Sequence, residues 1–401
     1  MVSVAEAQKI IELQDRDYGS ELVPFEQTLG RILAEDLYAD RDLPPCNRVT
    51  MDGIAIQYSS FEKGIRVYKV AATIAAGDAP TDITEESECV EIMTGAAMPD
   101  STDTVVRYED VAISNGIATI TADDIRKGQN LHLKGRDKKQ CDVVAKAGQV
   151  ISPALISMAA SVGKRELLVK KLPRVVIITT GDELVDVDEQ PTPYQVRRSN
   201  SYTIKAVLAQ NALPANMLHI PDDMEITRTK IKECLELYDV LLMSGGVSMG
   251  KFDYVPRVLE ELGVTKLFHK VQQRPGKPFW FGKDEMGVLV FAFPGNPVST
   301  FLCLHRYFIP WLMESKVKSR KSEVYAVLDS DVTFSAQMQY FMQVRVGVNE
   351  QGQLIAIPVE GNGSGDFANL LDSDAFMELP MGKLNFKKGE AYRIWPFKKI
   401  V

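Results

Sequence analysis

The chain has 401 residues, of which 45% are hydrophobic and 25% are charged, a composition typical of a globular protein with more than one domain. Its formal net charge is −8, and this acidic excess argues against a protein that follows a nucleic-acid backbone. No apolar run approaches the roughly 18 residues of a membrane-spanning helix, and the N-terminus does not resemble a signal peptide.

The five cysteines and four histidines are scattered along the chain. Scattered cysteines in odd number indicate a reducing compartment and argue against a disulfide framework or a zinc site. We therefore expect a cytoplasmic protein with no nucleic-acid or membrane partner.

Apolar residues three and four apart predict two N-terminal helices, over residues 4–13 and 23–37. A proline-rich joint at 42–49 then leads into short β-rich pieces that Gly, Pro and Asp divide, up to about residue 130. Helical periodicity returns at 152–163. We expect a helical linker domain formed by residues 1–43 and 132–170, split by a β-rich insertion domain at 44–131.

From Pro173 onward, apolar strands alternate with amphipathic helices, which predicts an open, mostly parallel α/β sheet over residues 171–316. The remaining residues, 317–401, contain only short strand patterns and predict a small β-barrel-like domain. The fold class is thus a multidomain α/β protein whose central sheet is its largest unit.

Glycine-rich or acidic loops follow the strands of this α/β unit. In open α/β sheets, ligands bind beyond the carboxyl ends of the strands, where glycine turns and helix N-termini favour phosphate or other oxyanions. We expect these loops to converge on one crevice. They read TTGDE (179–183), PDD (221–223), SGGVSMGKFD (244–253), QRPGKP (273–278) and FPGNP (293–297).

Four acids would share this crevice with Arg274 and Lys277. Carboxylates close to a bound polyanion repel it unless a divalent cation lies between them, and oxygen ligands beside phosphate favour Mg²⁺. The acids are Asp182, Glu183, Asp222 and Asp253. An alternative role for such an acid is helix N-capping; we assign that role to Asp223 and keep Glu183, Asp222 and Asp253 as metal ligands.

Two further turns lie in the β-rich insertion: TMDGIA, with Asp52, and IMTGAAMP, with Thr94. Together with TTGDEL, SGGVSMGKFD, RPGKP and FPGNPVS, in this order and spacing, they make the whole chain resemble the molybdopterin molybdenumtransferases, the MoeA and gephyrin family.

The resemblance implies a molybdenum insertase that takes adenylylated molybdopterin and molybdate, cleaves the phosphoanhydride with Mg²⁺ and releases AMP. It also implies a homodimer in which Asp52 and Thr94 act on the crevice of the other subunit. By motif match the catalytic residues would be Asp52, Thr94, Asp137, Glu183, Asp222, Asp253 and Lys277. The substrate-binding residues would be Asp182, Ser244, Gly245, Gly246, Ser248, Arg274, Pro294, Asn296, Pro297 and Ser364.

The chain departs from the family pattern at Arg274, where the family usually has lysine, and at Ile54, which replaces an aromatic residue. Two alternatives stay open: a molybdopterin adenylyltransferase, which has related SGG and PGNP motifs, and a non-catalytic pterin-binding scaffold. The long segment before Pro173 and the β tail argue against the first, and the number of crevice acids argues against the second.

Overall fold

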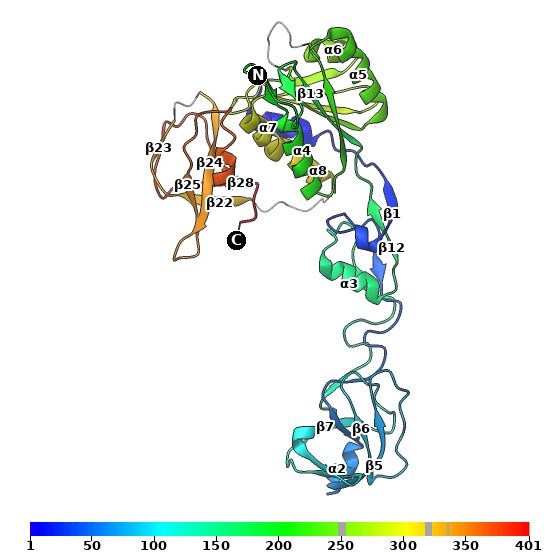
Figure 1. The fold of residues 1–401 in the computed structure, drawn as a ribbon. Helices are drawn as coiled ribbons and strands as arrows, with labels where there is room; N and C mark the ends of the chain where they lie inside the picture. Colours follow the sequence, from blue (N-terminus) through cyan, green and yellow to red (C-terminus); the bar gives the residue numbers. More distant parts are fainter. Residues whose placement is uncertain (248–253, 317–322, 335–336, 401) are drawn as a thin grey trace. The chain divides into compact units, whose positions relative to one another are not determined.

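The computed structural model describes residues 1–247, 254–316, 323–334 and 337–400 (Figure 1). By contacts within the chain it divides into two compact units. The first contains residues 1–22, 29–32 and 168–401, and the second contains residues 23–28 and 33–167. The boundary between the units falls within the paired strands β1 (Ser20–Pro24) and β12 (Glu166–Lys170).

The first unit is built on a six-stranded sheet in the order β16-β13-β17-β21-β20-β18. β13 pairs in parallel with β16 and β17, and β17 pairs in parallel with β21, while β20 runs against both of its neighbours. The sheet is therefore mostly parallel, as the strand–helix alternation predicts. Its strands are β13 (Val175–Thr180), β16 (Ala215–Ile220), β17 (Val240–Ser244), β18 (Thr265–His269), β20 (Trp280–Lys283) and β21 (Leu289–Phe293).

Helices cover both faces of this sheet, and the alternation of side chains along each strand divides the core in two. Val175 and Ile177 join one apolar cluster, while Val176 and Ile178 join the other. The first cluster takes residues from α1 (Val4–Glu12), α4 (Ser199–Gln210), α7 (Pro297–Cys303) and α8 (Ile309–Lys316). The second takes residues from α5 (Met224–Leu237) and α6 (Val255–Glu261). Because β13 is buried on both faces, its sequence reads as a continuous apolar run.

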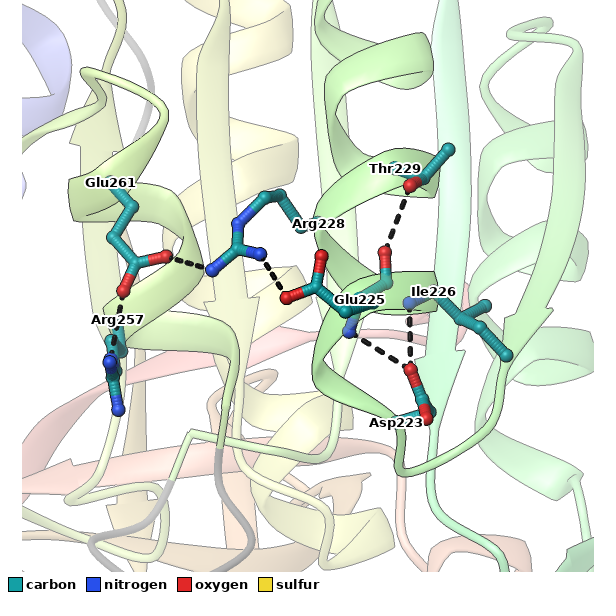
Figure 2. A network of polar contacts seen from close by, with 7 residues as sticks. All are labelled: Asp223, Glu225, Ile226, Arg228, Thr229, Arg257 and Glu261. Atoms are coloured by element: carbon teal, nitrogen blue, oxygen red, sulfur yellow. Dashed lines mark hydrogen bonds and ion pairs between the residues drawn. The ribbon is translucent and has the colours of Figure 1, made fainter.

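The helix α5 begins at a side-chain cap (Figure 2). Asp223 Oδ1 accepts hydrogen bonds from the backbone N–H groups of Glu225 and Ile226, both at 2.9 Å, so the capping role expected for Asp223 is confirmed. One turn later, Arg228 pairs with Glu225 on its own helix and with Glu261 on α6. These contacts fix the start of α5 and tie it to α6 on the surface.

The second unit contains the β-rich insertion, a six-stranded sheet in the order β7-β4-β6-β5-β9-β8. Buried residues of β4, β6 and β7 form its core, among them Ile54, Val90 and Val106. The strands are β4 (Gly53–Ile56), β5 (Val67–Ile74), β6 (Glu88–Ile92), β7 (Thr104–Arg107), β8 (Val111–Ser114) and β9 (Ile117–Ile120). The same unit carries α2 (Tyr58–Glu62) and α3 (Pro153–Ser161).

The expected helix over residues 23–37 is wrong. This segment contains the end of β1, a short 3₁₀ turn at Phe25–Gln27 and β2 (Leu37–Tyr38). Gly30 adopts a positive φ of +77°, which interrupts a helix, and the Leu33 N–H donates to the distant Gln149 carbonyl. Long-range backbone pairing therefore overrides the helical periodicity, and the linker is less helical than expected. The helix α1 packs in the core of the α/β unit. The boundaries of the four domains expected from the sequence stay a prediction.

The C-terminal segment forms a sheet in the order β19-β24-β25-β22-β28-β26, in which β24 also pairs with β26 and so closes a ring of strands. The two-residue strand β19 (Gln273–Arg274) comes from the α/β segment and pairs in parallel with β24. The others are β22 (Val324–Leu328), β24 (Gln339–Val348), β25 (Leu354–Pro358), β26 (Ala375–Leu379) and β28 (Ala391–Pro396). Among the described residues, no helix has the length and apolar character to span a membrane.

The cap on α5 gives a direct test. Asp223→Ala removes the acceptor of two backbone N–H groups and should lower the free energy of unfolding by about 1 kcal/mol, measured by urea denaturation. Asp223→Asn keeps a capping oxygen and should remain within a few tenths of a kcal/mol of the parent. Equal losses in both variants would show that the carboxylate charge, and not the capping oxygen, stabilises the helix.

Candidate functional site

The carboxyl ends of β13, β17 and β21 lie at the same level, because Thr179 is in register with Ser244 and Ser244 with Phe293. Glycine directly follows two of these strands: Gly181 after β13 has a φ of +133°, and Gly245 and Gly246 after β17 have φ values of +94° and +66°. These φ values favour glycine and leave the backbone bare of side chains at this edge. The turns can therefore bring backbone groups close to a ligand.

Two adjoining cavities open at this edge, with volumes of about 340 Å³ and 600 Å³. Both volumes fall in the range of small-molecule sites. The two cavities share a wall formed by Thr180, Glu183, Gly245, Gly295 and Asn296. We call them the acidic cavity, the smaller, and the arginine cavity, the larger, after the charged residues that line each one.

The acidic cavity contains the side chains of Glu183 and Asp222. Asp182 is not among the described residues that line the acidic cavity. Its hydrogen bonds fix the neighbouring loop instead. Its Oδ1 accepts the Asp222 N–H at 3.0 Å, and its own N–H donates to Asp222 Oδ2 at 3.4 Å. This reciprocal pair fixes the ends of β13 and β16 to each other and sets the position of Asp222.

The arginine cavity is lined by two basic residues that the sequence analysis missed, Arg197 and Arg198. Arg198 pairs with Asp186, which also accepts a hydrogen bond from the Tyr202 hydroxyl at 3.1 Å. The Val187 N–H, with Tyr202 and Arg198, lowers the pKa of Asp186 and keeps it charged. Two adjacent arginines were the available signal, but nothing in the local pattern placed them at this edge.

Asn200, in the first turn of α4, is a second residue that the sequence analysis missed. Its Nδ2 donates to Ser244 Oγ at 2.9 Å and to the Gly295 carbonyl at 2.7 Å. It thereby joins the end of β17 to the FPGNP turn after β21. Ser244 is buried and serves this connection, while Pro294 and Pro297 line the acidic and the arginine cavity respectively.

Arg274 was expected to share a crevice with the carboxylates, but it is not among the described residues that line the acidic cavity. Because β19 pairs with β24, Arg274 lines a third cavity of about 180 Å³ together with Ser364. Ser364 Oγ accepts a hydrogen bond from Asn296 Nδ2 at 2.8 Å. The Asn296 side chain therefore connects this third cavity to the other two. Lys277 is exposed and is not among the described residues that line any of the three.

The remaining candidates lie in the second unit. Asp52 Oδ1 accepts the Thr94 N–H at 2.6 Å, so these two residues lie side by side. Hydrogen bonds from Thr94, the backbone N–H first, lower the pKa of Asp52. Asp137 Oδ1 lies 2.9 Å from His132 Nε2, and the other ring nitrogen of His132 lies 3.4 Å from Arg48 Nη2.

Ser248 and Asp253 lie outside the described residues. Among the residues that are described, no group of three His, Cys, Asp or Glu side chains is arranged to hold a metal ion. The described part of the acidic cavity thus offers two carboxylates, from Glu183 and Asp222.

Comparison with known proteins identifies the family to which this chain belongs. Family models match the chain in succession: the MoeA N-terminal region (domain I and II) over residues 2–163, a probable molybdopterin binding domain over 176–314, and the MoeA C-terminal region (domain IV) over 325–397. A molybdopterin molybdenumtransferase from Synechocystis sp. is 37% identical over 395 residues, which cover 98% of this chain and 99% of the relative. The chain belongs to the molybdopterin molybdenumtransferase (MoeA) family.

Further members of the MoeA family agree over the full length. A molybdopterin molybdenumtransferase from Staphylococcus aureus (strain Mu50) is 31% identical over 401 residues, covering 98% of this chain and 95% of the relative. The crystal structure of a molybdopterin biosynthesis MoeA protein from Pyrococcus horikosii has 28% sequence identity and a TM-score of 0.82, with complete coverage of both chains. The family resemblance inferred from the six motifs is confirmed.

The glycine turn of this MoeA-family site can be tested by substitution. A Cβ at Gly246 would lie 2.6 Å from Thr180 Oγ1 and 2.9 Å from Val255 Cγ2. Gly246→Ala should therefore lower the free energy of unfolding by about 2–4 kcal/mol, measured by urea denaturation, through backbone strain and overpacking together. Gly263→Ala is the matched control in the same unit, since Gly263 has a φ of +83° and open space around it. It should lose only the strain, about 1–2 kcal/mol. Equal losses would mean that the turn tolerates a side chain.

The Asp52–Thr94 contact predicts a pH dependence. A carboxylate whose pKa is lowered by folding contributes stability that is present above its unfolded pKa, about 3.9, and is lost as the pH falls through the folded value. Asp52→Asn should therefore destabilise the protein at pH 7, and the difference from the parent should shrink below about pH 4. Thermal unfolding of both proteins across this range measures it. A difference that does not change with pH would contradict a role for the charge.

Proposed function

We propose that this chain is a molybdenum insertase, which transfers molybdenum from molybdate to adenylylated molybdopterin and releases AMP. The observation that carries the proposal is the acidic cavity, in which Glu183 and Asp222 face the Gly245–Gly246 turn in a chain of this family. The proposed site of action is the cytoplasm.

The acidic cavity suits a phosphorylated substrate only together with a cation. At an effective dielectric constant near 20, two like charges about 4 Å apart repel by about 4 kcal/mol, so a phosphate beside Glu183 and Asp222 needs compensation. No arginine or lysine is among the described residues that line this cavity. Backbone dipoles at the glycine turns favour the phosphate but do not cancel two carboxylates.

Magnesium fits these donors. Mg²⁺ is commonly bound by one or two carboxylates and by substrate phosphates, and Glu183 and Asp222 are two carboxylates in one cavity. We propose these two as ligands, with Asp253 as a third. When bound, the cation would neutralise charge on the phosphoanhydride. The chain's own part is to hold Asp222 through Asp182 and to hold the glycine turn through Asn200 and Ser244.

The other two cavities offer places for the remaining parts of the substrates. The arginine cavity, at about 600 Å³, suits a nucleotide or pterin, and Arg197 and Arg198 supply positive charge along its wall. The third cavity, with Arg274 and Ser364, offers a guanidinium and a hydroxyl to molybdate. We propose that Lys277, three residues after Arg274, adds positive charge for molybdate.

Asp52, Thr94 and Asp137 belong to the second unit. We propose that they act in trans in a homodimer, as the family resemblance implies, with Asp52 held in its charged form by Thr94.

The decisive experiment is AMP release from adenylylated molybdopterin. With Mg²⁺ present, purified protein should release AMP faster when molybdate is added, and Glu183→Gln should lower that rate by at least about a hundredfold if its charge is required. Asp223→Asn is the matched control, because this neighbouring acid caps α5 instead of lining the cavity, and it should retain the parent rate.

The outcomes separate the alternatives. A rate of AMP release that does not respond to molybdate would contradict the insertase proposal. Formation of adenylylated molybdopterin from ATP and molybdopterin would support an adenylyltransferase instead. Binding of the pterin without any turnover would support a scaffold.

A further inference from the structure

A buried hydrogen-bond network lies beneath the RPGKP loop and is not part of the site described so far. Its members are Gln273, Cys303 and Tyr307, with exposed fractions of 0%, 0% and 2%. Gln273 belongs to β19, whereas Cys303 ends α7 and Tyr307 lies in the π-helical turn Leu304–Phe308 that follows. The network therefore joins the loop that carries Arg274 and Lys277 to the helix that begins at the FPGNP turn.

The polar atoms of Gln273 are both used. Its Nε2 donates to the Gly276 carbonyl at 3.2 Å, and its Oε1 accepts from the Tyr307 hydroxyl. The Gly276 carbonyl can only accept, so the amide must present its NH₂ group there and its oxygen to Tyr307. Burial raises the pKa of Tyr307, so the phenol stays protonated and can donate.

The loop packs directly on this amide. Gly276 has a φ of +87°, and a Cβ there would lie 2.7 Å from Gln273 Nε2 and 2.9 Å from Cys303 Sγ. Two backbone contacts hold the loop ends: the Val271 N–H donates to the Lys277 carbonyl at 2.9 Å, and Arg274 pairs with Tyr340. In the middle of the loop, the Gly276 carbonyl accepts hydrogen bonds from Gln273 Nε2 and, at 3.9 Å, from Cys303 Sγ.

This loop borders two of the cavities. Arg274 and Pro275 line the third cavity, with Ser364, while Pro278 lines the acidic cavity. The side chains of Arg274 and Lys277 are exposed, so the position of their charges relative to a bound anion depends on the backbone of the loop. Gly276 lies between Arg274 and Lys277 in the chain, so a shift of its carbonyl would change the backbone that places both cations and would couple the buried network to anion binding.

We propose that Gln273 and Tyr307 are positioning residues, which fix the RPGKP loop so that Arg274 and Lys277 hold the oxyanion substrate. The inference rests on the proposed function for the identity of that oxyanion, which is molybdate. Leaving the Gln273 oxygen without its donor allows the amide to rotate and releases the Gly276 carbonyl. The effect is expected on oxyanion affinity more than on the rate of the chemical step.

The test uses Tyr307→Phe, Gln273→Met and the double variant in the full chain. Each single variant should raise the dissociation constant for molybdate, measured by calorimetry, and the KM for molybdate by about tenfold, with kcat within about twofold. The double variant should resemble the stronger single variant, since both changes break one network. Tyr392→Phe is the control: its hydroxyl is hydrogen-bonded to Glu390 and Lys383, away from the loop, and it should bind molybdate like the parent.

Backbone hydrogen exchange of Arg274, Gly276 and Lys277, the residues of the RPGKP loop that carry an N–H, gives a readout that is independent of activity. Faster exchange at Gly276 and Lys277 in Tyr307→Phe than in Tyr392→Phe is the expected result. Unchanged molybdate affinity and unchanged exchange, alongside a lower melting temperature, would overturn the proposal and leave a purely structural role. A parent protein that does not bind molybdate would contradict the proposed function, while the exchange result would still decide whether the network orders the loop.

Discussion

The parallel pairing of β13 with both β16 and β17 is the constraint on which the candidate site depends. Thr180 is in register with Ile220, and Thr179 with Ser244, so the loops after three strands begin at one level. Only with this register can Asp182 and Asp222 exchange hydrogen bonds between their carboxylates and backbone N–H groups. A slip of one residue would reverse the side-chain faces of a strand that is buried on both sides. The core and the site are therefore fixed by the same register.

A small number of fixed groups holds the backbone at this edge of the sheet. Gly245 and Gly246 contribute bare backbone, and the Asn200 amide joins Ser244 to the Gly295 carbonyl. Groups that are placed before a ligand arrives cost little to organise when it binds. The Thr180 hydroxyl is buried beside this turn without a hydrogen-bond partner among the described residues. At this edge, the hydroxyl of Thr180 thus stays without a hydrogen bond to any described residue while the backbone of the turn lies at the cavity.

The strands and their loops could be predicted from the sequence, because an apolar run that ends at glycine is typical of a buried strand in a parallel sheet. The same holds for Asp223, which stands directly before a helical pattern. The segment 23–37 could not, since its periodicity is helical while its partners are distant in sequence. The cavity that Arg274 lines could not be predicted for a similar reason: Arg274 lies in a two-residue pairing with β24, and such a short pairing leaves no sequence pattern. Asn200 carries no local signal, because its role exists only after three elements meet.

The acidic cavity and the third cavity carry opposite charges, and the side chain of Asn296 links them. Glu183 and Asp222 line the acidic cavity, and Arg274 lines the third one. Asn296 stands between them: it lines the acidic cavity and donates to Ser364 in the third. An amide at this position carries no net charge, whereas a lysine would pair with the carboxylates of the acidic cavity. In the proposed function, the phosphate would lie in the acidic cavity and the molybdate in the third cavity, with the neutral side chain of Asn296 between them. The FPGNP turn, which carries Asn296, is therefore the element that connects the two cavities without adding charge to either.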